Sequence, residues 1–201
     1  MTLDLTLGGC RFSLGFSCFA LGAACCLFAG LEDGGWLVLA ALLHEGGHVA
    51  ALWVFRAPPR EVRLSALGCR LVPDPARPLT PARSLGVSLA GPGVNLLAFG
   101  ALSLWGAGGS PLGLANLGLG LFHILPVPPL DGGLAFSTLL RWRLGEDLAG
   151  RWSKGAAVLF LLPLAALGFF VLLRTRYNFS LLALSLYLML FLVLGEEPLP
   201  P

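Results

Sequence analysis

Charged residues are scarce in this chain. They account for 12% of its 201 residues, about half of the roughly 25% found in soluble globular domains. Hydrophobic residues account for 56%, and the mean hydropathy is +0.83. This composition excludes an ordinary cytosolic enzyme and a disordered tail. Because the formal net charge is only +2, a phosphate-binding surface is excluded as well. We therefore expect an integral membrane protein with no nucleic-acid partner.

Cysteine pairs with metal-binding spacing are also missing. The chain has five cysteines, but no two of them have the spacing of a zinc knuckle or a CxxC motif. Four lie in or beside the first apolar run and one stands alone: Cys10, Cys18, Cys25, Cys26 and Cys69. We interpret all five as small buried hydrophobic residues.

Six apolar segments are bounded by charges or by clusters of proline and glycine. Most are close to the roughly 20 apolar residues that a helix needs to cross a bilayer. Their ranges are 12–31, 35–55, 84–107, 111–140, 155–173 and 178–195, and the fourth is broken. The sequence therefore predicts one domain with an all-α polytopic membrane fold of about six transmembrane helices.

The connections between these segments differ in positive charge. The loop from Arg56 to Arg83 contains six arginines, and the loop from Arg141 to Lys154 contains four cations. By the positive-inside rule, this pattern predicts a multi-pass protein of the cell membrane with both termini in the cytoplasm. Arg174 and Arg176 fall on the opposite side, but two cations do not outweigh ten.

The first basic loop contains an extended segment. Polar and apolar residues alternate between Glu61 and Val72, which predicts a short membrane-associated strand or β-hairpin after the second span. An extended segment beside a membrane site could pair with an extended peptide by strand addition, here near Val62–Leu67. The alternative is a surface hairpin that caps the helices.

The second apolar segment contains three ionisable side chains, His44, Glu45 and His48. An ionised side chain costs about 2.5–3.5 kcal/mol at the centre of a bilayer on insertion scales, so these residues need a partner. The HExxH spacing places both histidines on one helix face, which suits two nitrogen ligands of a tetrahedral zinc ion. Glu45 is offset around the helix and could act as general base beside the metal. A hydrogen-bonded polar cluster is the alternative.

Asp131 is the best candidate for a third ligand, since a catalytic zinc usually has three protein ligands. It lies in LPVPPLDGG, residues 125–133, where three prolines and two glycines must interrupt a helix. Broken backbone at membrane depth is tolerated where it lines a protein cavity, and a carboxylate there fits a metal ligand. The alternative is an interfacial turn in which Asp131 caps a helix.

Asn95 is a further polar residue in an apolar segment. It ends the motif AGPGVN, residues 90–95, and its amide can both donate and accept hydrogen bonds. It could hold the substrate backbone or the oxyanion near the metal. An interhelical hydrogen bond is an equally open alternative.

Three motifs, HEGGH, AGPGVN and LPVPPLDGG, occur in this order and together resemble the site-2 protease family of intramembrane zinc metalloproteases. The segment EVRLSALG resembles the strand that usually follows the HExxH helix in that family. The resemblance implies a single membrane-embedded protease domain over residues 1–201. Its catalytic core would be residues 35–140, with flanking spans at 1–34 and 141–201.

The resemblance also implies site roles. Zinc would be held by His44, His48 and Asp131, with Glu45 as general base. His123 stands where the family more often has asparagine, just before LPVPPLDG. It could position the substrate, donate a hydrogen bond in the transition state or replace Asp131 as a ligand. A histidine satisfied within the protein core is the alternative.

The small size, the lack of an inserted PDZ module and the basic loop are most similar to one branch of the family. That branch contains the bacterial sporulation protease that processes a sigma-factor precursor. No C-terminal nucleotide-sensing module follows the last span here, so we expect that kind of regulation to be absent or to come from another chain.

We therefore expect an intramembrane zinc metalloendopeptidase that acts in regulated intramembrane proteolysis. Its substrate would be a membrane protein or a membrane-associated peptide, and a membrane partner would regulate it. The alternative, from another class, is a non-catalytic metal-binding membrane scaffold or a metal carrier. A carrier predicts further polar residues along the spans, and few are present.

Overall fold

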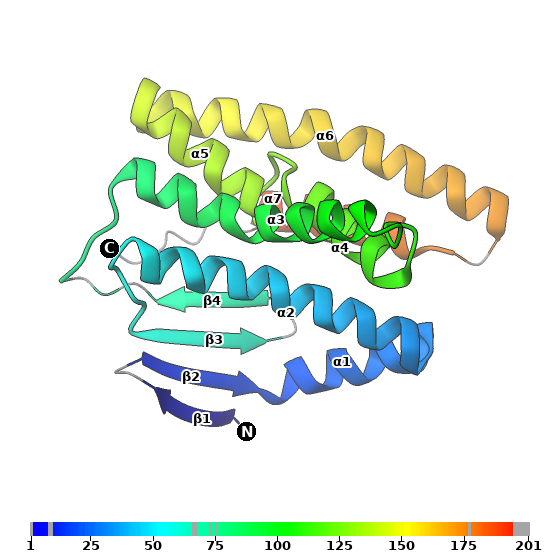
Figure 1. Cartoon of the computed structure of the whole chain (residues 1–201). Coiled ribbons are helices and arrows are strands. Elements are labelled where there is room, and N and C mark those ends of the chain that lie inside the picture. The colour runs from blue at the N-terminus through cyan, green and yellow to red at the C-terminus, as the bar shows by residue number, and fades with distance from the viewer. Residues whose placement is uncertain are drawn as a thin grey trace. The chain divides into compact units, whose positions relative to one another are not determined.

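The computed structural model of the chain describes residues 2–7, 10–65, 68–72, 74, 76–176 and 178–194. These residues contain seven helices and four strands (Figure 1). The chain forms two compact units, unit 1 at Met1–Phe122 and unit 2 at His123–Pro201. The assignment of residues 1–201 to one protease domain stays a prediction.

A four-stranded sheet in unit 1 has the strand order β1–β2–β3–β4. The strands are β1 (Thr2–Leu7), β2 (Cys10–Gly15), β3 (Glu61–Ser65) and β4 (Gly68–Val72). β1–β2 and β3–β4 are antiparallel pairs, whereas β2 and β3 are parallel. A parallel pair needs a long crossover, and helices α1 (Phe16–Ala29) and α2 (Leu31–Val54) provide it. The hairpin predicted between Glu61 and Val72 is confirmed, although its residues 66–67 lie outside the described part.

The first predicted span, residues 12–31, is wrong. Residues up to Gly15 belong to β2, and α1 has only 14 residues, roughly 21 Å of helix against a hydrocarbon core of about 30 Å. TLDLTL and CRFSLG each alternate polar and apolar residues and are separated by two glycines, a pattern typical of a hairpin. The apolar run that begins at Phe12 hid this signal.

The central position of β3 bears on the predicted strand addition. β3 pairs with β2 on one side and with β4 on the other, so its backbone has no open edge for a peptide. In the described sheet, only the outer strands β1 and β4 have an edge without a neighbouring strand. Strand addition near Val62–Leu67 is therefore blocked along β3, and Leu67 itself lies outside the described residues.

One face of this sheet carries ion pairs. Arg11 donates to Asp4 over 2.7 Å, Ser13 donates to Asp4 over 2.5 Å, and Arg63 donates twice to Glu61, over 2.8 and 2.9 Å. The Ser13 hydroxyl and the Arg11 guanidinium hold the pKa of Asp4 below its ordinary value. The bonds from Arg63 do the same for the pKa of Glu61. Acidification should therefore weaken this part of the sheet.

Unit 1 continues with α3 (Pro81–Leu104) and α4 (Pro111–His123), whose last residue is the first of unit 2. Thr80 caps α3, because its side-chain oxygen accepts from the backbone N–H of Arg83, and Pro81 occupies the first helical position, where proline is favoured. α2 packs against both α1 and α3 (Figure 1). The HEGGH and AGPGVN motifs therefore lie on neighbouring helices.

Unit 2 contains the helices α5 (Asp131–Leu144), α6 (Glu146–Thr175) and α7 (Ser180–Leu194). α6 packs against α5 and α7. The break predicted within residues 111–140 is confirmed, since α4 ends at His123 and α5 begins at Asp131. The prolines between them cannot continue a helix.

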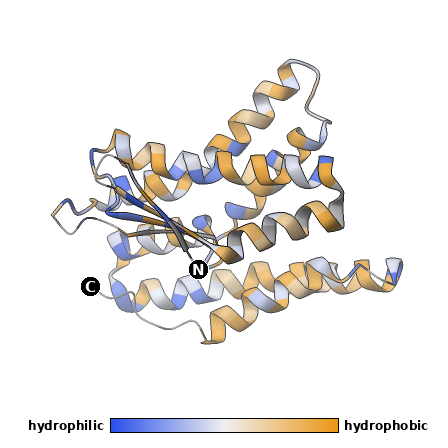
Figure 2. Ribbon diagram, turned by 90° about the horizontal axis from the view of Figure 1, so that it is seen from below, coloured by the Kyte–Doolittle hydropathy of each residue, from blue (hydrophilic) through white to orange (hydrophobic). Residues whose placement is uncertain are grey.

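Three of the described helices, α2, α3 and α6, are long and apolar enough to cross a membrane, and α7 is a shorter apolar helix. Figure 2 shows hydrophobic residues along much of the length of the helices. The prediction of about six spans is too high for this part of the chain, because α1, α4 and α5 have 13 or 14 residues. The fold was predicted to be all-α. The structure is mostly helical but also contains a small sheet. The cytoplasmic location of both termini stays a prediction.

Candidate metal centre

The two histidines of HEGGH lie together on α2. His44 and His48 are both buried, with 3% and 6% of their surface exposed. Their Nε2 atoms are 3.3 Å apart, and the rings meet edge to face. Glu45 follows His44 on the same helix and is half-buried.

The protonation of the His48 ring follows from its partner. Its Nδ1 atom lies 2.8 Å from the backbone carbonyl oxygen of Val87 on α3. A carbonyl oxygen can only accept, so Nδ1 carries the hydrogen and donates it. In the neutral ring, Nε2 then carries a lone pair.

The same reasoning applies to His44, whose Nδ1 atom lies 2.6 Å from Oδ1 of Asn95. The Asn95 amide nitrogen donates to the carbonyl oxygen of Ala40 over 3.0 Å and to Oδ1 of Asn116 over 2.8 Å. These two bonds fix the orientation of the amide. Oδ1 of Asn95 must therefore accept from His44, and Nε2 of His44 also carries a lone pair.

When both rings are neutral, two such lone pairs at this distance repel each other, and a cation bound between them removes the repulsion. Two nitrogen ligands of a tetrahedral zinc ion, each 2.0–2.1 Å from it, are about 3.3–3.4 Å apart. The observed 3.3 Å between the Nε2 atoms of His44 and His48 matches that separation. Their Nδ1 atoms bond to oxygen acceptors, as is usual for metal-binding histidines. The histidine pair therefore fits a metal ion such as zinc.

Two glycines give these histidines their room. A Cβ atom at Gly91 would collide with the ring of His48, including its Nε2 atom. A Cβ atom at Gly47 would lie 2.8 Å from the carbonyl oxygen of Ala90, closer than side chains approach. The close contact of α2 and α3 beside these histidines therefore requires glycine in both motifs.

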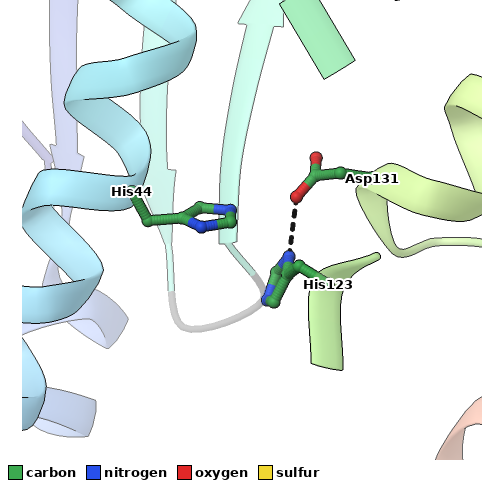
Figure 3. Close-up of side chains that lie close together, drawn as sticks. All are labelled: His44, His123 and Asp131. Atoms are coloured by element: carbon green, nitrogen blue, oxygen red, sulfur yellow. Dashed lines mark hydrogen bonds and ion pairs between the residues drawn. The ribbon is translucent and has the colours of Figure 1, made fainter. Parts of the chain in front are cut away.

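In unit 2, Asp131 and His123 are bonded to each other. The His123 Nδ1 atom lies 2.7 Å from Oδ2 of Asp131, and Figure 3 shows this bond. Their side chains are 28% and 16% exposed. A carboxylate can only accept, so His123 donates this bond. Asp131 is the first residue of α5, directly after the N-cap residue Leu130. A negative charge there is favoured by the helix dipole.

The predicted site residues are thus divided between the units. His44, Glu45, His48 and Asn95 belong to unit 1, whereas His123 and Asp131 belong to unit 2. His44, His123 and Asp131 are candidate metal ligands by residue type. The interhelical alternative for Asn95 is observed, since its amide joins α3 to α2 and α4.

Asn116 is a residue of this region that sequence analysis missed. It is completely buried and bonds to Asn95. The signal that could have found it is the one that singled out Asn95, a lone amide in an apolar helix that needs a hydrogen-bond partner.

The chain matches no protein-family model and no curated protein. Among solved structures, it is similar to the site-2 protease from Methanocaldococcus jannaschii, with a TM-score of 0.65 and 18% sequence identity. The match covers 100% of this chain and 98% of that one. At this identity the likeness shows the fold alone, so the chain has a site-2-protease-like fold.

Proposed function

We propose that this chain is an intramembrane zinc metalloendopeptidase that cleaves a peptide bond within or beside a membrane. The observation that carries the proposal is the histidine pair of α2. Its Nε2 atoms have the separation of two zinc ligands, and both rings are held through Nδ1. The pair lies on a helix apolar enough to span a membrane, in a chain with a site-2-protease-like fold.

The proposed ligands are His44 and His48 of unit 1 and Asp131 of unit 2. Two imidazole nitrogens and one carboxylate oxygen form a donor set typical of catalytic zinc. His123 orients the Asp131 carboxylate through its bond to Oδ2, as partners of ligating carboxylates commonly do. The alternative assignment makes His123 itself the third ligand in place of His48 or Asp131.

A bound zinc ion polarises a peptide carbonyl and lets water act as a nucleophile near neutral pH. Glu45 supplies the proton transfer. Its carboxylate takes a proton from the attacking water and then gives that proton to the leaving nitrogen. Glu45 can do so because it is offset from the histidine face of α2 and is only half-buried.

The proposed substrate is a membrane protein or a membrane-associated peptide. Its cleavage is a step of regulated intramembrane proteolysis, and a membrane partner regulates it. The apolar composition and the three candidate spans support a membrane location. The outer edges of β1 and β4 are the places where an extended substrate could pair with the sheet. The likeness to the sporulation branch stays a prediction.

The decisive experiment compares membranes that contain the native chain with membranes that contain Glu45→Gln. Quantitative mass spectrometry of membrane peptides should find fragments that accumulate only with the native chain. Both forms should contain zinc, because Glu45 is not a ligand, whereas cleavage should fall about 10²–10⁴-fold without the general base. Equal fragments with both forms would refute the role of Glu45. Zinc without any fragments would favour the metal-binding scaffold.

A further inference from the structure

We propose that Asn116 on α4 is a positioning residue for the metal centre. Through Asn95 it holds the His44 ring in the form that is protonated at Nδ1 and carries its lone pair at Nε2. It acts on His44 indirectly, because Asn116 bonds to Asn95 and Asn95 bonds to His44. The inference rests on the proposed function only where it concerns metal binding.

The relay is a directional series of three hydrogen bonds. Nδ1 of His44 donates to Oδ1 of Asn95 over 2.6 Å, and Nδ2 of Asn95 donates to Oδ1 of Asn116 over 2.8 Å. Nδ2 of Asn116 donates to the carbonyl oxygen of Leu112 over 2.9 Å. Each donor finds an acceptor, so the direction of one bond sets the direction of the next.

Two backbone carbonyls make this direction fixed. Reversal of the Asn116 amide would place its oxygen against the carbonyl oxygen of Leu112. Reversal of the Asn95 amide would place its oxygen against the carbonyl oxygen of Ala40 and against Oδ1 of Asn116. Carbonyl oxygens cannot donate, so each reversal loses hydrogen bonds and sets acceptor against acceptor.

Burial makes the relay effective. Asn95 and Asn116 are both 0% exposed, so water cannot replace a lost partner, and an unsatisfied polar group at this depth is costly. Asn116 therefore contributes one of the two acceptors that keep Oδ1 of Asn95 directed at His44. Without Asn116, only Ala40 would fix the Asn95 amide.

The test uses Asn116→Leu, which keeps the branching of the side chain but removes the acceptor, and the smaller Asn116→Ala as a second variant if the leucine variant does not fold. Ser185→Ala is the matched control, because Ser185 is equally buried but, among the described residues, its hydroxyl bonds to a carbonyl of its own helix, α7. Asn95→Asp combined with Asn116→Leu is the rescue. The protonated carboxyl that full burial favours donates to the carbonyl oxygen of Ala40 and accepts from His44 with its other oxygen, so it keeps the His44 bond without Asn116.

The first readout is the imidazole ¹⁵N spectrum of the metal-free protein, which contains only three histidines. We expect His44 to be protonated at Nδ1 in the native chain, in Ser185→Ala and in the rescue. In Asn116→Leu we expect a mixture of the Nδ1-protonated and Nε2-protonated tautomers. The second readout is Zn²⁺ affinity in competition with a chelator. It should fall about 10-fold in Asn116→Leu, the lower end of the 10- to 100-fold range for outer-shell partners, and recover in the rescue.

The two readouts separate the inference from the proposed function. If the native chain binds no Zn²⁺, the proposed function fails, while the ¹⁵N spectra still decide the relay. An unchanged His44 tautomer in Asn116→Leu or Asn116→Ala would overturn the inference. A loss of affinity in Asn116→Leu that Asn95→Asp does not restore would also overturn it, because Asn116 would then be merely structural.

Discussion

The α2–α3 pair of unit 1 and the α6–α7 pair of unit 2 are both apolar, and both use glycine for close contact, but their buried polar groups differ. In unit 1, His44, His48 and Asn95 bond from one helix to another. In unit 2, the hydroxyl of Ser185 bonds to a carbonyl three residues earlier in α7. Gly168 of α6 gives α7 its room, as a Cβ atom there would lie 2.6 Å from the backbone nitrogen of Leu182.

This difference separates packing from function. A hydroxyl that bonds within its own helix satisfies itself and imposes nothing on a neighbour. The polar groups of α2 and α3 depend on one another, and they are costly to bury unless every partner is in place. Substitutions in the α2–α3 region should therefore change metal binding, whereas comparable changes between α6 and α7 should change stability alone.

The largest expected effect lies at the start of α5, and it tests whether unit 2 supplies a ligand. Asp131→Ala removes a proposed ligand and should weaken Zn²⁺ binding by more than about 100-fold, beyond the range of outer-shell changes, and abolish most cleavage. His123→Asn should keep the zinc content and most of the activity, because an amide can still donate to Oδ2 of Asp131. Elemental analysis and chelator competition measure both.

The opposite pattern would change the assignment. If His123→Asn loses the metal and Asp131→Ala keeps it, His123 is the ligand and Asp131 is not. Asp131→Glu sharpens the distinction, since it should retain metal with poorer geometry if a carboxylate is the ligand.

A smaller effect is expected at the contact of α2 and α3. Gly91→Ala should displace the His48 ring and weaken Zn²⁺ binding by about 10-fold or more, as for a perturbed metal shell. Gly93→Ala is the control in the same motif, because a Cβ atom there meets nothing within 4 Å, and alanine favours a helix by about 1 kcal/mol. Equal Zn²⁺ affinity in the two variants would contradict the role of Gly91 in making room for the His48 ring.

The smallest effect concerns the sheet. The pKa values of Asp4 and Glu61 lie below 3.8 and 4.5, their ordinary values, so their ion pairs stabilise the folded state fully above those values. That stability should be lost as the pH falls through the lowered pKa values, with little change between pH 7 and pH 5. Amide exchange of β1 and β2, corrected for its intrinsic pH dependence, measures it.

Glu61→Gln controls that experiment, because it removes one of the two titrating groups. The variant should be less protected than the native chain at pH 7 and should lose less protection on acidification. The same acid sensitivity in both would mean that Glu61 is not responsible.

The sequence was most informative where a polar residue interrupts an apolar segment. HEGGH predicted two neighbouring imidazoles because its spacing fixes their position within one helix. Asn116 could not be paired with Asn95 in advance, since their contact joins α3 and α4 across 21 positions of sequence. The motif glycines could be noted from the sequence, but only the structure shows that Gly91 makes room for His48.

The sheet could be predicted from the sequence only in part. Alternation predicted the β3–β4 hairpin because the surrounding loop is polar enough for it to stand out. The same alternation in β1 and β2 was masked by the apolar helix that follows directly. The parallel pairing of β2 with β3 depends on the path of two helices between them, which periodicity alone does not encode.

The most direct test of the account is the zinc content of the purified native chain, His44→Ala, His48→Ala and Ser185→Ala, measured side by side. The account predicts about one zinc per native chain, as for a single catalytic site, the same value for Ser185→Ala, and loss of most zinc in both histidine variants. Zinc retained by both histidine variants, or none in the native chain, would contradict the assignment of the α2 histidines as metal ligands.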